Sequence, residues 1–169
     1  KAGELAPGDS IVLNDHRALA GWQGARTEAE GYLIGLLVGD GTLKQDKAVL
    51  SVWDVAAEQV ANGAPVMSSG AAGIMAAAET AARTLKHRSD FQGWQRPIAG
   101  RGEYRMAIGA LKTLAGDLGL APGAKRLTAQ IERTSSDFYR GLLRGLFDAD
   151  GSVQGTQDKG ISIRLTQVD

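Results

Sequence analysis

One motif occurs twice in the sequence, 110 residues apart, as LIGLLVGDG at residues 33–41 and as LRGLFDADG at residues 143–151. In each copy an apolar run with regularly spaced glycines ends in Asp-Gly, and Asp40 of the first copy aligns with Asp150 of the second. Each copy is followed by two short segments with the composition of a β-hairpin, and the second turn carries five extra residues. The repeat predicts two related structural units, each a helix followed by a hairpin.

Both motif runs are predicted to be helices. Thr27 and Glu30 have the spacing of a capping box, and residues 134–137, TSSD, offer several N-cap candidates before the second run. Glycines then recur at every fourth residue, which places them on one helix face. A glycine inside a helix costs about 1 kcal/mol relative to alanine, so this stripe indicates two helix backbones in close contact. The helix-interface residues are therefore predicted to be Gly31, Gly35, Gly141 and Gly145.

Parallel packing of the two stripes would bring Asp40 and Asp150 together at the C-terminal ends of their helices. Two carboxylates at the negative ends of helix dipoles repel each other unless a cation lies between them. Hard divalent cations prefer oxygen ligands, and paired carboxylates that hold Mg²⁺ are suited to phosphodiester hydrolysis. We therefore predict a Mg²⁺ site in which Asp40 and Asp150 are the catalytic, metal-binding residues.

The Asp-Gly pairs could instead have a purely structural or calcium-binding role. A single Asp-Gly after a helix is most often only a turn, and Asp-x-Asp-Gly also begins calcium-binding loops. A calcium loop counted from Asp148 lacks the further acidic ligands and the final Glu, and two copies in register argue against a mere turn. Asp148 aligns with Val38 and is expected to pair with Arg144, four residues earlier, rather than to bind metal.

Composition excludes several classes of protein. The 169 residues contain no cysteine, which rules out disulfides and thiolate metal sites and predicts a reducing, cytoplasmic setting. No apolar stretch is long enough to span a bilayer, so no membrane partner is expected. The net charge is zero, but residues 81–133 carry ten basic and four acidic side chains, a bias that suits either a polyanion or a solvated surface. The chain starts without Met and stops within a strand pattern, which predicts a longer parent protein.

The two motifs and the segments behind them resemble a LAGLIDADG homing endonuclease of the single-chain, pseudo-symmetric type, over most of residues 27–169. The resemblance implies an α+β fold with two pseudo-symmetric αββαββα halves, of which the second is truncated. The motif helices would form the central interface, and two saddle-shaped sheets would straddle the DNA major groove. The last acid of each motif would coordinate a shared metal, and Gly39 and Ala149 are expected to add backbone carbonyls as metal ligands.

The flanking residues resemble part of an intein. Residues 1–15, KAGELAPGDSIVLND, are similar to the last strands of an N-terminal splicing block, and the whole run resembles the endonuclease insert of inteins in bacterial ribonucleotide reductases. Three segments follow: splicing-block strands and a linker at 1–26, a first LAGLIDADG half at 27–133, and the start of a second half at 134–169. The sequence lacks the N-terminal nucleophile, the Thr-x-x-His block and the C-terminal His-Asn of a complete intein, so these residues alone cannot carry splicing.

Further elements are predicted between and after the motifs. Residues 55–86 are expected to form two helices, residues 103–108 a strand, and residues 111–118 a helix that Gly119 ends. After the second motif, Ile161, Ile163 and Leu165 alternate with polar residues, which predicts a strand whose apolar side packs on the core.

Polar residues on the expected sheet faces are candidates for contact with DNA. Their side chains suit base edges and phosphates. For any one strand residue an ordinary surface role is favoured, and the fold resemblance is what supports the set. Arg105 could be the basic residue near the metals or part of a salt bridge, and Lys125 could contact phosphate or be a surface charge. The candidates are Lys44, Lys47, Ser51, Arg105, Lys125, Ser152, Gln154, Ser162, Arg164 and Thr166.

Together these observations predict a site-specific, Mg²⁺-dependent double-strand DNA endonuclease that acts at an intein insertion site. Its expected partners are double-stranded DNA and the host protein in cis, and the chain is expected to be a monomer with an internal pseudo-two-fold axis. Two alternatives remain at this point: a LAGLIDADG module that binds nucleic acid without cleaving it, and an inactive intein remnant.

Overall fold

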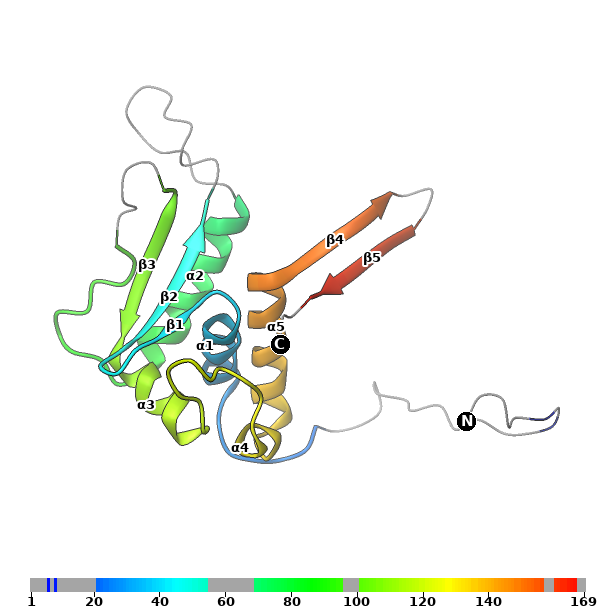
Figure 1. The fold of residues 1–169 in the computed structure, drawn as a ribbon, viewed down its shortest axis with the longest axis horizontal. Helices are drawn as coiled ribbons and strands as arrows, with labels where there is room; N and C mark the ends of the chain where they lie inside the picture. Colours follow the sequence, from blue (N-terminus) through cyan, green and yellow to red (C-terminus); the bar gives the residue numbers. More distant parts are fainter. Residues whose placement is uncertain are drawn as a thin grey trace, which may run out of the picture.

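The computed structural model of this protein describes residues 6, 8, 21–54, 69–95, 101–156 and 160–166. The elements in these ranges follow one another as shown in Figure 1: α1 (Glu28–Val38), β1 (Thr42–Leu43), β2 (Ala48–Trp53), α2 (Ser69–Thr84), β3 (Glu103–Ile108), α3 (Gly109–Asp117), α4 (Ala129–Glu132), α5 (Ser136–Asp150), β4 (Gly151–Thr156) and β5 (Gly160–Leu165). The mixture of helices and antiparallel strands is the predicted α+β class. The intein-like segment at 1–15, apart from residues 6 and 8, and the first helix expected within 55–86 lie outside the described residues.

The two motif helices, α1 and α5, run side by side at the centre of the molecule (Figure 1). The side chain of Thr27 accepts a hydrogen bond from the Glu30 backbone N–H, and the Glu30 carboxylate accepts one from the Thr27 N–H. Ser135 caps α5 in a similar way by accepting from the Phe138 N–H. Both predicted helix starts are therefore confirmed. No helix in the described ranges has the length and hydropathy of a membrane span.

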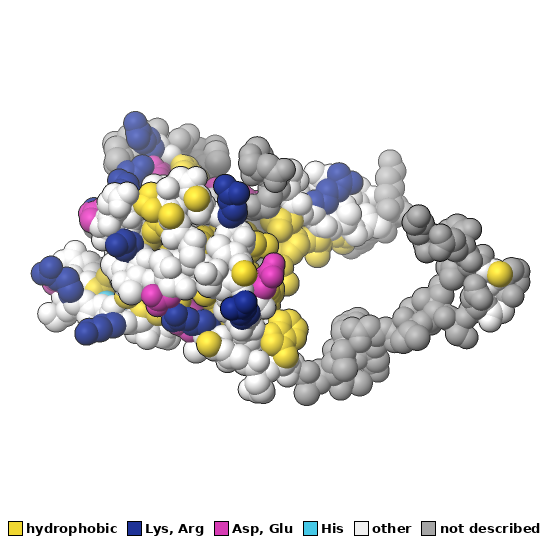
Figure 2. Space-filling model, turned by 60° about the horizontal axis from the view of Figure 1, so that its bottom comes forward, with side chains coloured by type: hydrophobic (Ala, Val, Ile, Leu, Met, Phe, Trp, Pro, Cys, Tyr) yellow, Lys and Arg dark blue, Asp and Glu magenta, His cyan; other side chains and the backbone are white. Residues whose placement is uncertain are grey.

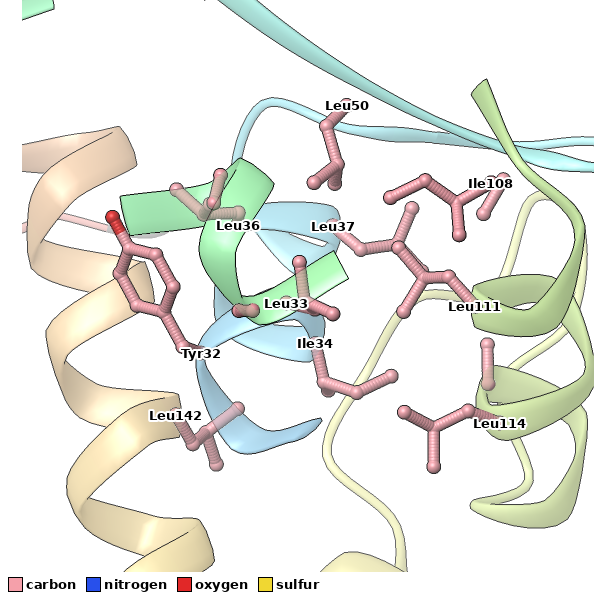
Figure 3. Packing of buried hydrophobic residues seen from close by; sticks show 14 of the residues in the cluster. Tyr32, Leu33, Ile34, Leu36, Leu37, Leu50, Ile108, Leu111, Leu114 and Leu142 are labelled. Carbon is pink, nitrogen blue, oxygen red and sulfur yellow. The ribbon is translucent and has the colours of Figure 1, made fainter. Parts of the chain in front are cut away.

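Strands β1, β2 and β3 form an antiparallel sheet with β2 in the centre. Leu50 of β2 lies opposite Met106 of β3, and because directly opposed residues point to the same side, both face the helices. Figure 3 shows Leu37 of α1 close to Ile108 and to Leu111 of α3, all of them buried beneath this sheet. Helices therefore cover one face of the sheet and leave the other face outside the core.

The first half contains one strand fewer than the predicted αββαββα order, within the residues that the structure describes. In place of a further strand, Gln95 forms an isolated antiparallel bridge to Arg105 and donates its N–H to the Arg105 carbonyl at 2.8 Å. The strand and helix predicted at 103–108 and 111–118 are confirmed by β3 and α3, and Gly119 follows α3 with a φ of +78°.

The second hairpin, β4–β5, projects from the end of α5 away from the first sheet (Figure 1). The prediction that Ile161 and Ile163 pack on the core is wrong, because these side chains are 66% and 68% exposed. Val153, opposite Ile163, is also exposed, whereas Leu165 is partly buried against the core. The alternation itself is present, but in the described residues no helix layer covers the apolar side of this hairpin. Figure 2 shows hydrophobic side chains on the surface of this projecting arm.

Candidate active site

Glycines bring α1 and α5 into backbone contact. A Cβ atom built on Gly31 would come within 3.0 Å of the Phe138 carbonyl oxygen, and one built on Gly141 would come within 3.0 Å of the Glu28 carbonyl oxygen. Real Cβ atoms essentially never approach backbone this closely, so a larger residue would force the helices apart. The structure places all four predicted interface glycines at this contact: Gly31, Gly35, Gly141 and Gly145.

The two acids of the motifs lie at the same end of this helix pair. Asp40 follows α1, and Asp150 is the last residue of α5. A Cβ atom built on Gly39 would lie 2.5 Å from the Ala149 Cβ and 3.1 Å from Oδ2 of Asp150, so the Asp150 carboxylate borders the backbone that carries Asp40. Burial, and then the negative charge of Asp150, raises the pKa of Asp40, while Lys125 lowers it in part. The two carboxylates therefore share one electrostatic environment.

Lys125, in the segment before α4, caps the C-terminal end of α1. Its Nζ donates to four backbone carbonyls, those of Leu37 at 3.0 Å, Val38 at 3.2 Å, Gly39 at 3.2 Å and Gly41 at 2.5 Å. The last carbonyls of a helix have no intrahelical partner, so this ammonium group satisfies them. Burial lowers the pKa of Lys125, and the negative charges of Asp40 and Asp150 raise it in part. Lys125 thus interacts electrostatically with both acids.

The chemistry of the donors at this helix end suits a hard divalent cation. Two carboxylates and neighbouring backbone carbonyls offer only oxygen atoms, and Mg²⁺ is commonly held by one or two carboxylates and several waters. The Gly39 carbonyl, predicted as a metal ligand, accepts a hydrogen bond from Lys125. No group of three or more His, Cys, Asp or Glu side chains suited to a metal occurs in the described ranges. Asp40 and Asp150 are therefore the side chains that could hold Mg²⁺ here.

Asp148, two residues before the second acid, faces α1. The Tyr32 hydroxyl donates to Oδ2 of Asp148 at 2.6 Å, and Nε of Arg144 lies 3.7 Å from the same oxygen. The Arg144 guanidinium also lies over the Tyr32 ring, 4.8 Å from the ring centroid. Burial, and then the hydrogen bond to Asp148, raises the pKa of Tyr32 well above its usual value. The expected Arg144–Asp148 pair is confirmed, and Tyr32 is a partner that sequence reasoning missed.

Glu103 engages two of the predicted DNA-contacting residues on the outer face of β2 and β3. Nε and Nη2 of Arg105 donate to the Glu103 carboxylate at 2.8 and 2.7 Å, and Oγ of Ser51 donates to it at 3.0 Å. These bonds, with that of Arg105 the strongest influence, lower the pKa of the buried Glu103. Of the two alternatives for Arg105, the salt bridge is the one observed. The basic residue expected near Asp40 and Asp150 is instead Lys125.

The remaining candidates for DNA contact lie on the two hairpins that follow the motif helices. Lys44 and Lys47 form the turn between β1 and β2, where the Lys44 N–H donates to the Lys47 carbonyl at 2.9 Å. Thr166 follows β5 and is exposed. On the second hairpin the register pairs residues that therefore share one face: Ser152 with Arg164 and Gln154 with Ser162.

A cavity of about 1300 Å³ lies apart from the acids, between the end of α2 and α3. Its lining includes Arg26, Lys86, Phe91 and Asp117, and neither acid of the motifs belongs to it. This cavity is therefore separate from the candidate site at the helix ends.

Comparison with known families gives a match to part of the chain. The model of the LAGLIDADG-like domain matches residues 137–169, which comprise most of α5 and the β4–β5 hairpin. The matched segment includes Asp148 and Asp150 and lies within the second copy of the repeat. No curated protein matches the chain.

Proposed function

We propose that this chain is the nuclease part of a site-specific, Mg²⁺-dependent double-strand DNA endonuclease of the LAGLIDADG homing type. One observation carries the proposal: Asp40 and Asp150 converge at the ends of two glycine-packed helices, with Lys125 acting on both. The family match over residues 137–169, which contain the second acid, supports the same assignment.

The proposed roles follow from the chemistry of the helix end. Asp40 and Asp150 would hold Mg²⁺, and the Ala149 carbonyl would be a further oxygen donor. When bound, the metal would supply Lewis-acid chemistry that suits phosphodiester hydrolysis. Lys125 keeps the end of α1 in place through its carbonyl contacts, and its charge offsets in part the rise in the pKa of Asp40 that burial and Asp150 cause.

The proposed DNA contacts lie on the hairpins behind each acid. β4 begins directly after Asp150, so the polar face that carries Arg164 and Gln154 leads away from the site. On the first half, Lys44 and Lys47 offer positive charge in the β1–β2 turn, and the Glu103-bound Arg105 lies on the outer sheet face. Lysines and arginines in such positions bind phosphates, and side chains of adjacent strands read base edges.

We further infer that the nuclease belongs to an intein and that its target is the uninterrupted host gene at the insertion point. The basis is the sequence resemblance of residues 1–15 to a splicing block and of the whole run to inteins of ribonucleotide reductases. On this proposal residues 27–133 and 134–169 are parts of two pseudo-symmetric halves, and the host protein lies in cis.

The direct test is a cleavage assay on a plasmid that carries the uninterrupted host allele, with Mg²⁺ or with EDTA. Asp40→Asn and Asp150→Asn are each expected to abolish linearisation and to leave DNA retardation on a gel intact. Asp90→Asn is the matched control, because the Asp90 side chain is 64% exposed and pairs only locally with Arg88. Cleavage by Asp150→Asn at the rate of the control would refute the assigned mechanism.

The second candidate is a LAGLIDADG module that binds nucleic acid without cleaving it. Two observations favour it: the Gly39 carbonyl is engaged by Lys125, and the described residues supply only two carboxylates at the helix ends. DNA retardation that weakens with salt but is indifferent to Mg²⁺, without cleavage, would select this function. Neither binding nor cleavage would point to an inactive remnant.

A further inference from the structure

The glycine contacts between α1 and α5 are reciprocal. Under the offset of 110 residues, Gly31 corresponds to Gly141 and Glu28 corresponds to Phe138. Gly31 lies against the carbonyl of Phe138, and Gly141 lies against the carbonyl of Glu28. Each helix therefore presents the same backbone surface to its partner, as in an isologous interface. The glycine contacts alone would allow α1 to pack against α5. They would equally allow either helix to pack against the same helix of a second molecule.

A polar pair breaks this equivalence. Tyr32 of α1 donates its hydroxyl to Asp148 of α5 at 2.6 Å. The offset places Leu142 in the position of Tyr32 and Val38 in the position of Asp148, so the equivalent site of the repeat holds two apolar residues. In the observed pairing the two polar residues are hydrogen-bonded to each other, and the repeat would place Leu142 opposite Val38.

Homotypic pairing would mix these partners. If α5 paired with a second α5, each Asp148 would face Leu142 of the other copy and lose its hydroxyl donor. If α1 paired with a second α1, each Tyr32 hydroxyl would face Val38 and lose its acceptor, although Tyr32 is only 4% exposed. An unpaired polar group at a buried contact weakens that contact by roughly tenfold, and a dimer of two α1 helices would contain two such hydroxyls. In a dimer of two α5 helices each Asp148 would keep Arg144 of its own helix, but its carboxylate would face an apolar side chain in place of the Tyr32 hydroxyl.

We propose that Tyr32 and Asp148 are a pairing code that commits α1 to α5 of the same chain and disfavours pairing of either helix with its own copy. Arg144 strengthens the code, because its guanidinium contacts both the Asp148 carboxylate and the Tyr32 ring. The residue that corresponds to Arg144 in α1 is the fully buried Ile34, so this contact is also absent from the equivalent position. The inference concerns helix pairing alone and stands whether or not the chain cleaves DNA.

Disulfide trapping can read the pairing directly, because the chain has no cysteine of its own. Ala149 corresponds to Gly39 under the offset, and these two residues face each other across the helix contact. Position 149 would therefore face itself in a dimer made by two α5 helices. A cysteine introduced by Ala149→Cys would form a disulfide between two molecules in that dimer, and would face Gly39 in the intramolecular pairing.

The parent for the experiment is Ala149→Cys in the full chain, oxidised mildly and resolved without reductant. Adding Asp148→Val removes both mismatches from the α5 dimer and leaves the Tyr32 hydroxyl unpaired within the chain. We expect the disulfide-linked dimer to rise roughly a hundredfold, about tenfold because the α5 dimer loses its mismatches and about tenfold because the pairing within the chain is weakened. Adding Tyr32→Leu as well restores an apolar match within the chain, and the dimer should then fall back by about tenfold while staying above the parent.

Two controls separate pairing from general unfolding. Arg88→Cys combined with Asp148→Val reports random collision, since the Arg88 side chain is 87% exposed and lies far along the chain from the helix contact. Tyr32→Phe in the Ala149→Cys parent keeps the ring and removes only the hydroxyl, so a smaller rise in dimer is expected even if Asp148→Val disturbs folding. Equal dimer yields throughout the position-149 series, or an equal rise at position 88, would overturn the pairing code.

Discussion

Gly35→Ala is the sharpest test of the helix contact that positions the candidate site. A Cβ atom at this position would lie 2.9 Å from both the Gly145 Cα and the Leu146 backbone nitrogen, and closer still to the Leu142 carbonyl oxygen. All three are backbone atoms of α5 and cannot rotate away. To regain ordinary contact distances, the helices must separate by roughly 0.5–1 Å.

Two opposing effects determine how much Gly35→Ala changes the free energy of unfolding. Overpacking of a close-packed contact costs about 1–3 kcal/mol, and the upper part of that range applies where the clash is with backbone. Alanine is favoured over glycine inside a helix by about 1 kcal/mol, which offsets part of the loss. We therefore expect Gly35→Ala to lower the free energy of unfolding by about 2 kcal/mol.

The matched control is Gly73→Ala, in the middle of α2. A Cβ atom there meets nothing within 4 Å, so only the helix-propensity gain applies and the free energy of unfolding should rise by about 0.5–1 kcal/mol. Urea denaturation followed by circular dichroism measures both variants. A Gly35→Ala variant that is as stable as Gly73→Ala would refute backbone contact between α1 and α5.

Three further predictions rest on single hydrogen-bonded groups. Lys125→Met removes the positive charge that lowers the pKa of Asp40, so the pKa of Asp40 should rise further, as measured by NMR titration of its carboxyl carbon. The pKa of Glu103 is lowered in the folded state, so its stabilising effect is present above its unfolded pKa near 4.5 and is lost as the pH falls through the folded value. The difference in unfolding free energy between wild type and Glu103→Gln should therefore be largest above about pH 5.5 and shrink toward pH 3, as followed by urea denaturation across that range. Tyr32→Phe removes the hydroxyl that donates a hydrogen bond to α5, so the free energy of unfolding should fall by about 1–2 kcal/mol. The control Tyr139→Phe should change it by less than about 0.5 kcal/mol. Equal effects of the two variants in thermal denaturation would contradict the role of the Tyr32 hydrogen bond.

Local signals in the sequence predicted the helix starts and the strands. The capping box at Thr27 and Glu30 and the serine cap before α5 depend on spacings of three residues, which the chain realises without help from distant segments. The glycines of the motifs, spaced by four residues, likewise identify the helix face that must meet another backbone. The repeat then places the two acids at one end, because equivalent positions on two parallel helices lie at equal heights.

The apolar side of the second hairpin shows that the alternation of apolar and polar residues alone does not predict burial. Ile161 and Ile163 alternate as a half-buried strand should, yet alternation states only that one side is apolar and not that another layer covers it. The motif helices show the same limit. Leu33 and Leu37 of α1 are fully buried beneath α2, α3 and the first sheet, whereas their counterparts Leu143 and Phe147 on α5 are 49% and 39% exposed.

The position of Lys125 could not be derived from its neighbours, because a long-range contact fixes it. The chain turns after α3 through a bridge between Ala121 and Ala124, and the Thr128 hydroxyl donates to the Leu118 carbonyl at 2.5 Å. These contacts bring Lys125 back to the end of α1, 84 to 88 residues earlier in the chain. A lysine there satisfies helix carbonyls and offsets the charge of two carboxylates at once. The candidate site at the end of the helix pair is therefore assembled from three separate segments, and the motif contains only two of them.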